Sequence, residues 1–245
     1  MNAADRLRYL FEEQINVLPI AENLVVFDED NYLEEMHKRH FHTAVFVREG
    51  QYWKFDDGAS APAPILPEDI IPADTPLIKA FRMLINRRRY FIEEHGKLAY
   101  IVTRTDLDKI PIRIGFFGLI SILETHLKDL IRKYLPDWEE SISENRLGQA
   151  KELYQWKLSR NEEIDLVQCL QFGDLGSIFS KKQRFKKFDP DLSRDGFTDM
   201  MNDLGKLRDA LAHSQASLGF TWEELDQKIA FVRQIIDAAD PEFEG

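Results

Sequence analysis

The alternation of apolar and polar residues changes character near the middle of the chain. Up to about Lys109, short apolar runs typical of strands alternate with helical patterns. A strand at 23–27 is followed by a helix at 32–40 and by strands at 43–47 and 51–55. Strands that alternate with helices in this way indicate an α/β layer.

A similar order of elements recurs after a loop at 56–67 that is rich in proline and small residues. Asp74 or Thr75 can cap the helix of this second unit. Two strands follow, near 90–94 and 97–102. Two units of about 45 residues with the same order of elements predict an internal repeat.

After Pro111 the periodicity becomes wholly helical. A first apolar stripe at helical spacing reaches about Tyr134, and its members are Phe116, Leu119, Ile120, Leu123, Leu127, Leu130 and Ile131. Further helical patterns cover 143–158, 162–172, 197–214 and 222–239. The predicted fold class is therefore α+β, with an N-terminal α/β part followed by an all-α helical bundle.

Length and composition fit two folded domains. The chain has 245 residues, of which 44% are apolar, whereas a usual domain has about 100–150 residues. The excess of 43 Asp and Glu over 32 Lys and Arg argues against a surface that binds nucleic acid everywhere, although a local basic patch fits.

Cysteine content and hydropathy bear on the compartment. Cys169 is the single cysteine, so it forms no internal disulfide and indicates a reducing compartment, with the cytoplasm as the expectation. The longest apolar run, 114–123, is about half of the roughly 20 residues that a membrane span needs. No membrane anchor is expected.

Thr103-Arg104-Thr105-Asp106 directly follows the last strand of the second unit. Together with 72–77, this stretch resembles a CBS domain, a family of tandem α/β pairs that commonly bind AMP or ATP. The ribose-binding signature of that family is Ser/Thr-x-x-Asp after a strand. The resemblance implies that Thr103, Arg104 and Asp106, with Thr75, bind an adenine nucleotide. A carboxylate suits the ribose hydroxyls, and an arginine suits phosphate.

Thr103 and Asp106 have a second interpretation, because Thr-x-x-Asp is also a pattern that caps a helix. The first unit departs from the family pattern, since no Ser/Thr-x-x-Asp follows its strand at 51–55. We therefore expect at most one ligand site in the pair.

Near the end of a helical pattern stands Arg208-Asp209-Ala210-Leu211-Ala212-His213. The last stretch of the chain resembles a HEPN domain, a bundle of four or five helices with an Arg-x(4–6)-His motif late in the domain. Active members of that family are metal-independent ribonucleases that work as dimers, while some relatives only bind or have lost activity. The resemblance implies that Arg208 and His213 are catalytic and that Asp209 is the polar residue that often follows the arginine.

The spacing of the motif supports a shared site. Five residues place Arg208 and His213 about 140° apart around a straight helix, so one copy alone converges them poorly and a homodimer is expected. His213 can transfer protons, Arg208 can meet the charge on phosphorus, and Asp209 can orient the imidazole. The alternative is that Arg208 pairs with a bundle carboxylate such as Glu124, and that His213 satisfies carbonyls at a helix end.

One segment is strongly basic in an otherwise acidic chain, and its cations are Lys181, Lys182, Arg184, Lys186 and Lys187. Phe185 and Phe188 are interleaved with them. These cations can contact the backbone phosphates of RNA, and the two rings can stack on its bases, so the segment predicts an RNA-binding surface. A solvated loop is the alternative.

His37, His40 and His42 form a cluster in the sequence. Their spacing crosses from a helix into a strand, and no cysteine lies nearby to complete a ligand set. We interpret them as surface or turn residues and expect no metal.

The two resemblances cover most of the chain and predict a CBS-like pair at 15–109 and a HEPN-like bundle at 112–240. The expected function is a metal-independent endoribonuclease that acts on RNA, needs no cofactor for catalysis, and is controlled by AMP or ATP. The alternative is a non-catalytic nucleotide-sensing or interaction protein whose bundle dimerises or docks a partner.

Overall fold

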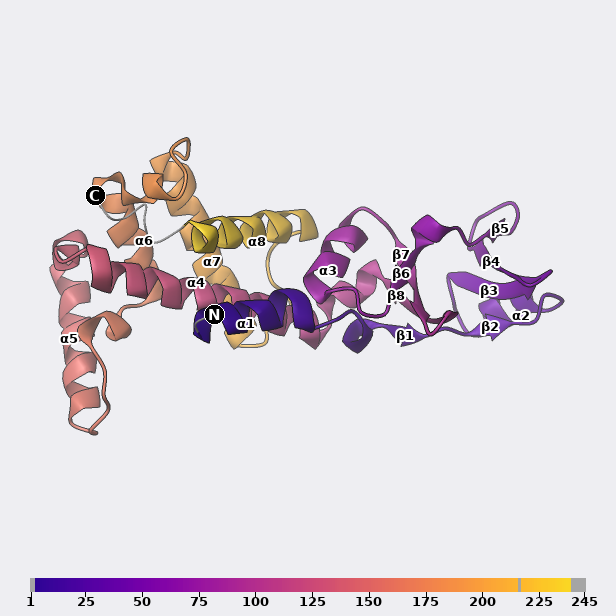
Figure 1. The fold of residues 1–245 in the computed structure, drawn as a ribbon, viewed down its shortest axis with the longest axis horizontal. Coiled ribbons are helices and arrows are strands. Elements are labelled where there is room, and N and C mark those ends of the chain that lie inside the picture. Colours follow the sequence, from indigo (N-terminus) through magenta and orange to yellow (C-terminus); the bar gives the residue numbers. More distant parts are fainter. Residues whose placement is uncertain (1–2, 216, 239–245) are drawn as a thin grey trace. The chain divides into compact units, whose positions relative to one another are not determined.

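The strands of this chain precede its long helices, as the sequence pattern predicts (Figure 1). The computed structural model describes residues 3–215 and 217–238. Two units divide the chain: an α/β unit, Glu12–Ile112, and a helical unit that combines the residues up to Phe11 with those from Arg113 onward. The fold class is α+β, as predicted. The helix predicted at 222–239 and the bundle predicted at 112–240 extend to positions 239 and 240, which lie outside the described residues.

The α/β unit contains two copies of one motif, in which a strand and a helix lead into an antiparallel hairpin. In each copy the first strand pairs in parallel with the first strand of the hairpin. The first copy comprises β2 (Val26–Phe27), α2 (Tyr32–Lys38), β3 (Thr43–Arg48) and β4 (Gln51–Asp56); the second comprises β6 (Ile70–Pro72), α3 (Leu77–Ile85), β7 (Arg89–Glu94) and β8 (Lys97–Thr103).

The two hairpin turns show the repeat most directly. Glu49 and Gly50 have φ of 51° and 77°, and His95 and Gly96 have φ of 51° and 76°. Two successive residues with positive φ are typical of the two-residue type I′ turn, which matches the twist of a hairpin. The equivalent turns lie 46 positions apart in the numbering. The predicted internal repeat is confirmed.

A short strand that precedes each copy pairs with the hairpin of the other copy. β1 (Glu22–Asn23) precedes the first copy but pairs antiparallel with β8 of the second. β5 (Ala63–Pro64) precedes the second copy but pairs antiparallel with β4 of the first. The results are two four-stranded sheets, β1-β8-β7-β6 and β2-β3-β4-β5. The exchange covers one edge of each hairpin, where unpaired amides and carbonyls would otherwise be exposed.

The two copies also share a core. Val45 of β3 clusters with Phe91 of β7 and Leu98 of β8. Arg89 of β7 forms an ion pair with Asp56 of β4 at 2.5 Å. The sheets are therefore joined by apolar packing, by charge and by the exchanged strands.

The helical unit begins with α1 (Ala3–Tyr9) and a π-helical turn (Leu10–Gln14). Its longer helices are α4 (Ile110–Tyr134), α5 (Glu144–Leu158), α6 (Phe172–Ser180), α7 (Arg194–Ala212) and α8 (Trp222–Asp237). Short 3₁₀ turns occupy Leu18–Ile20, Pro67–Asp69, Arg104–Asp108, Trp138–Ser141, Leu166–Cys169 and Lys181–Lys187. The predicted apolar stripe of α4 is confirmed, because all seven of its members are buried.

The helix predicted at 162–172 is wrong. That segment contains a 3₁₀ turn, Leu166–Cys169, and α6 begins only at Phe172. The Asp165 side chain accepts from the backbone N–H of Gln168 at 2.9 Å, and Asp174 accepts from that of Gln171 at 2.8 Å. Two local caps therefore divide the segment.

α4 is long and apolar enough to cross a membrane by length and composition alone, with a mean hydropathy of 1.4 over its most apolar window. Half of that window is buried inside the protein. A buried core helix passes the same test of length and composition.

The N-terminal segment packs against α4 at a glycine. A Cβ added to Gly118 would lie 2.4 Å from the Phe11 ring, closer than atoms can approach. We expect Gly118→Ala to lower the free energy of unfolding by about 1–3 kcal/mol through overpacking, measured by urea denaturation.

The matched control is Gly148→Ala in α5, where an added Cβ meets nothing within 4 Å. Higher helix propensity should raise stability there by about 0.5–1 kcal/mol. Removal of the ring by Phe11→Ala should abolish most of the cost of Gly118→Ala. An equal cost in both backgrounds contradicts the packing.

Candidate functional site

The Arg-x-x-x-x-His motif lies at the end of α7. Leu204, Leu207 and Ala210 are buried, and this face holds the helix against the core. Arg208 is therefore turned toward the edge of that face, while His213 is the C-cap, with φ of −98° and ψ of 10°. The helix ends one residue before the histidine that the motif supplies.

Arg208 belongs to a network of charges that joins α7 to α4. Its Nε lies 3.2 Å from Oε2 of Glu124, and its Nη1 lies 3.3 Å from Oδ1 of Asp209. Lys128 contacts the other oxygen of Glu124 at 2.8 Å. The pairing of Arg208 with Glu124, which the sequence analysis gave as the alternative, is present. Glu124 has a cation on each oxygen.

A hollow of about 630 Å³ opens beside this network. We call it the motif groove, and its charged lining residues are Glu124, Lys128, Arg208 and Asp209. His213 is not among its lining residues. The imidazole is exposed at the end of α7. One copy of the chain thus brings Arg208 and Asp209 together and leaves His213 outside.

Asp209 is positioned toward Arg208. The carboxylate lies 3.3 Å from the guanidinium of its neighbour, and its side chain is 66% exposed. Its backbone carbonyl accepts from the N–H of His213 at 3.0 Å, as the end of a helix requires. The predicted contact between the Asp209 carboxylate and the His213 ring stays a prediction.

Cys169 also lines the motif groove. Burial raises the pKa of its thiol above the ordinary value of 9.0. A raised thiol pKa leaves little thiolate near neutral pH, and the thiolate is the nucleophilic form. Cys169 is suited to packing and not to nucleophilic attack.

Thr103 and Asp106 cap the 3₁₀ turn that follows β8. Oδ2 of Asp106 accepts from the backbone N–H and from the hydroxyl of Thr103, each at 2.7 Å. Oδ1 of Asp106 lies 2.8 Å from Nζ of Lys109. The capping interpretation is therefore present, and both oxygens of this buried carboxylate have partners within the chain.

The other two nucleotide candidates differ in exposure. Thr75 is buried, and its hydroxyl donates to the carbonyl of Pro72 at 2.7 Å. Arg104 is exposed, and its backbone N–H donates to the carbonyl of Arg88 at 3.0 Å. Of the four candidates, Arg104 has the side chain most accessible to a ligand.

The five cations of the basic segment differ in burial: Arg184 is buried, whereas the four lysines are exposed or half-buried. Arg184 is 8% exposed and donates to Ser141 Oγ at 2.9 Å, to the carbonyl of Ile178 at 3.0 Å and to Asp137 at 2.8 Å. Lys182 also pairs with Asp137. The Arg184 guanidinium thus anchors the segment to the unit.

The expectation that the two phenylalanines stack on bases is wrong. Phe185 is fully buried and stacks on Phe197, with ring centroids 5.1 Å apart. Phe188 is 8% exposed and packs beside Phe179. These rings belong to the core, because the segment folds back as a 3₁₀ turn whose apolar side chains point inward.

The lysines of the segment occupy different environments. Lys186 donates to the carbonyl of Pro190 at 3.3 Å, while Lys187 is half-buried. Lys181 lines a second hollow, of about 280 Å³, together with Arg194 at the start of α7. Arg194 and Lys128 were not among the residues predicted from the sequence. Each lies on a helix whose other face is buried, and neither belongs to a cluster of cations along the chain.

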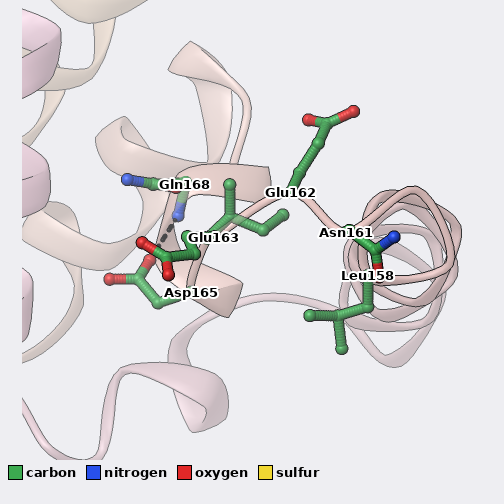
Figure 2. Close-up of a pocket in the computed structure, with 7 residues that line it drawn as sticks. Leu158, Asn161, Glu162, Glu163, Asp165 and Gln168 are labelled. Carbon is green, nitrogen blue, oxygen red and sulfur yellow. Dashed lines mark hydrogen bonds between the residues drawn. The ribbon is translucent and has the colours of Figure 1, made fainter.

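A third hollow, of about 690 Å³, lies between the end of α5 and the Leu166–Cys169 turn (Figure 2). Asp165 accepts from Gln168 there and forms an ion pair with Arg132. Figure 2 shows the Glu162 side chain turned away from Asp165. No Lys, Arg or His is among its described lining residues, so the hollow offers carboxylates and no cation to a phosphate, which makes it a weaker candidate.

The structure contains no group of three or more His, Cys, Asp or Glu placed to hold a metal ion within residues 3–215 and 217–238. His37, His40 and His42 are exposed, and His40 lies in a turn with φ of 56°. Their interpretation as surface and turn residues is confirmed.

The buried position of Arg184 predicts a structural role. We expect Arg184→Ala to lower the free energy of unfolding by about 3 kcal/mol, because it leaves buried partners unsatisfied. Lys182→Ala should change it by at most about 0.5 kcal/mol, since that lysine is exposed. The hydrogen bond from Lys182 and the charge of Arg184 lower the pKa of Asp137 from 3.8. The Arg184 effect should therefore persist at neutral pH and shrink once the pH falls below about 4, as thermal denaturation at several pH values would measure.

The cap at Asp106 predicts a loss of stability that needs no ligand. We expect Asp106→Ala to lower the free energy of unfolding by about 1–2 kcal/mol without nucleotide, because it removes the partner of Thr103. Arg104→Ala should leave the melting temperature nearly unchanged, since that side chain is exposed. An unchanged melting temperature for Asp106→Ala contradicts the capping role.

Comparisons with protein-family models, with curated proteins and with solved structures find no match for this chain.

Proposed function

We propose that the helical unit is a metal-independent endoribonuclease that acts as a homodimer, with Arg208 and His213 as its catalytic residues. The observation that carries the proposal is the placement of the motif. Arg208 lines a groove large enough for part of an RNA strand, and His213 is exposed at the end of the same helix.

The chemistry is attack of a 2′-hydroxyl on the adjacent phosphorus. The 2′-oxygen forms a bond to phosphorus, the bond from phosphorus to the 5′-oxygen breaks, and the products are a 2′,3′-cyclic phosphate and a 5′-hydroxyl. One imidazole takes the proton of the attacking hydroxyl, and a second donates a proton to the leaving oxygen. Two copies of His213 supply both groups in a dimer.

Arg208 stabilises the additional negative charge on phosphorus in this scheme. Glu124 holds the Nε edge of the guanidinium at 3.2 Å, and Asp209 lies near Nη1. An arginine has five N–H donors, so these contacts leave others for phosphate oxygens. Glu124 is thus a positioning residue that fixes the direction of the guanidinium.

The α/β unit is proposed to control this activity through an adenine nucleotide. Arg104 would meet its phosphates, and Thr103, Asp106 and Thr75 are the further candidates. A ribose at Asp106 would exchange with the contacts to Thr103 and Lys109 that now occupy the carboxylate. Such a ligand regulates the helical unit only if its affinity differs between two states of the protein.

A second candidate function is a non-catalytic nucleotide sensor or interaction protein. The ion pair of Arg208 with Glu124 favours it, because a paired arginine at the end of a helix also serves structure alone. The position of His213 outside the motif groove favours it as well.

Cleavage of RNA in EDTA distinguishes the two functions. Purified wild type and His213→Ala are incubated with end-labelled, mixed-sequence RNA, each with and without AMP or ATP. We expect metal-independent cleavage by the wild type, a rate about 10²–10⁴-fold lower in His213→Ala, and a change of the wild-type rate with nucleotide.

His42→Ala is the matched control. Its side chain is 92% exposed and lies in the α/β unit, so its loss should leave cleavage unchanged. Absence of cleavage by the wild type under every condition, or equal cleavage by His213→Ala, refutes the ribonuclease. Nucleotide binding without cleavage supports the sensor.

A further inference from the structure

The hollow beside α6 and α7 that Lys181 and Arg194 line has an unusual charge for this protein. We call it the hydroxyl hollow, and its other polar lining includes Ser141, Ser177, Ser180 and Thr198. None of its described lining residues is a carboxylate. The chain as a whole has 43 Asp and Glu against 32 Lys and Arg, so such a surface is distinctive.

The two cations of the hydroxyl hollow are exposed and uncompensated. Among the residues that the structure describes, neither Lys181 nor Arg194 has an ion pair or side-chain hydrogen bond. Other cations nearby do have partners, such as Lys182 with Asp137. Two unpaired cations over one hollow attract an anion, and arginine binds phosphate well because its donors form a fixed fork.

The floor of the hollow retains hydroxyl donors. Ser141 and Ser180 are buried. The Ser141 oxygen accepts from Arg184, which leaves its O–H proton for another acceptor. The hydroxyls of Ser180 and Thr198 lie 3.1 Å apart, so one donates to the other and the second keeps its proton. Neutral donors below and cations above suit a phosphate diester.

The hydroxyl hollow adjoins the motif groove. The two share Gly173, Met201 and Asn202 in their linings. Arg194 and Arg208 lie at opposite ends of this path on α7, about 21 Å apart at the rise of an α-helix. A chain with several regularly spaced phosphates fits such a path better than a single anion does.

We propose that the hydroxyl hollow binds a backbone phosphate of the RNA strand, several nucleotides away from the phosphate that is attacked at Arg208. This inference rests on the proposed function and extends it: the substrate is a single strand that follows α7 from Arg194 to Arg208. The site reads the sugar-phosphate backbone and not the bases, because its lining offers cations and hydroxyls to phosphate oxygens.

The test measures binding without cleavage. A fluorescein-labelled single-stranded RNA of 12 nucleotides is titrated with full-length protein that carries His213→Ala, at several salt concentrations. The test variant adds Lys181→Ala and Arg194→Ala. We expect its Kd to rise at least about tenfold near 0.1 M salt, and the slope of log Kd against log salt to fall by about 0.7, for one phosphate that is no longer neutralised.

The matched control adds Lys151→Ala and Lys206→Ala instead, which removes the same charge. Both lysines are exposed, lie in the helical unit and line neither hollow. Their Kd and salt slope should stay at the background values. A second test variant, Lys181→Gln with Arg194→Gln, keeps longer side chains, and thermal unfolding checks that every variant is folded.

The outcomes separate this inference from the ribonuclease. Equal Kd and slope for the test variants and the background overturn the phosphate site, even if His213→Ala abolishes cleavage. Weaker binding by the test variants and not by the control supports the phosphate site. That result holds even if the wild type cleaves no RNA, in which case the ribonuclease alone fails.

Discussion

Burial of the apolar stripe of α4 is the constraint on which the helical unit depends. The seven residues of that stripe are at most 1% exposed, so the remaining helices must enclose one side of α4. This packing fixes which residues of other elements face the polar side of α4. Glu124 forms an ion pair with Arg208 of α7, and Arg132 forms one with Asp165 at the start of the Leu166–Cys169 turn. The motif groove lies along this polar side, and its charges are held in place by packing on the opposite side of the same helix.

The sequence predicted the elements whose signals are strong and local. The stripe of α4 repeats over several turns, and the strands predicted at 43–47, 51–55, 90–94 and 97–102 lie within β3, β4, β7 and β8. The helix expected at 162–172 failed because side-chain caps by Asp165 and Asp174 compete with a continuous helix. The strand exchange was not predicted. The single strand expected at 23–27 is divided between β1 and β2, and β1 pairs with a strand about 80 positions later. β5 has only two residues, too few for a recognisable strand pattern.

The candidate site was predictable in part. Both roles weighed for Arg208 came from its sequence context, and its pairing with Glu124 is present. The basic segment shows what a sequence cannot distinguish. Arg184 is buried because Asp137 and Ser141, more than forty residues earlier, accept its hydrogen bonds. Phe185 is buried because Phe197 packs on it. Partners so far away in the chain leave no local pattern.

Because of the strand exchange in the α/β unit, the strands of its two sheets become available at different times during synthesis. The sheet β2-β3-β4-β5 is complete once Pro64 has been made, because all its strands are local. β1 must instead wait for β8, whose paired residues lie about 80 positions later. At roughly 5–20 residues per second, the ribosome needs about 4–16 s for that stretch. For that time β1 has no partner strand, and the second sheet can close only after every strand of the first sheet has been synthesised.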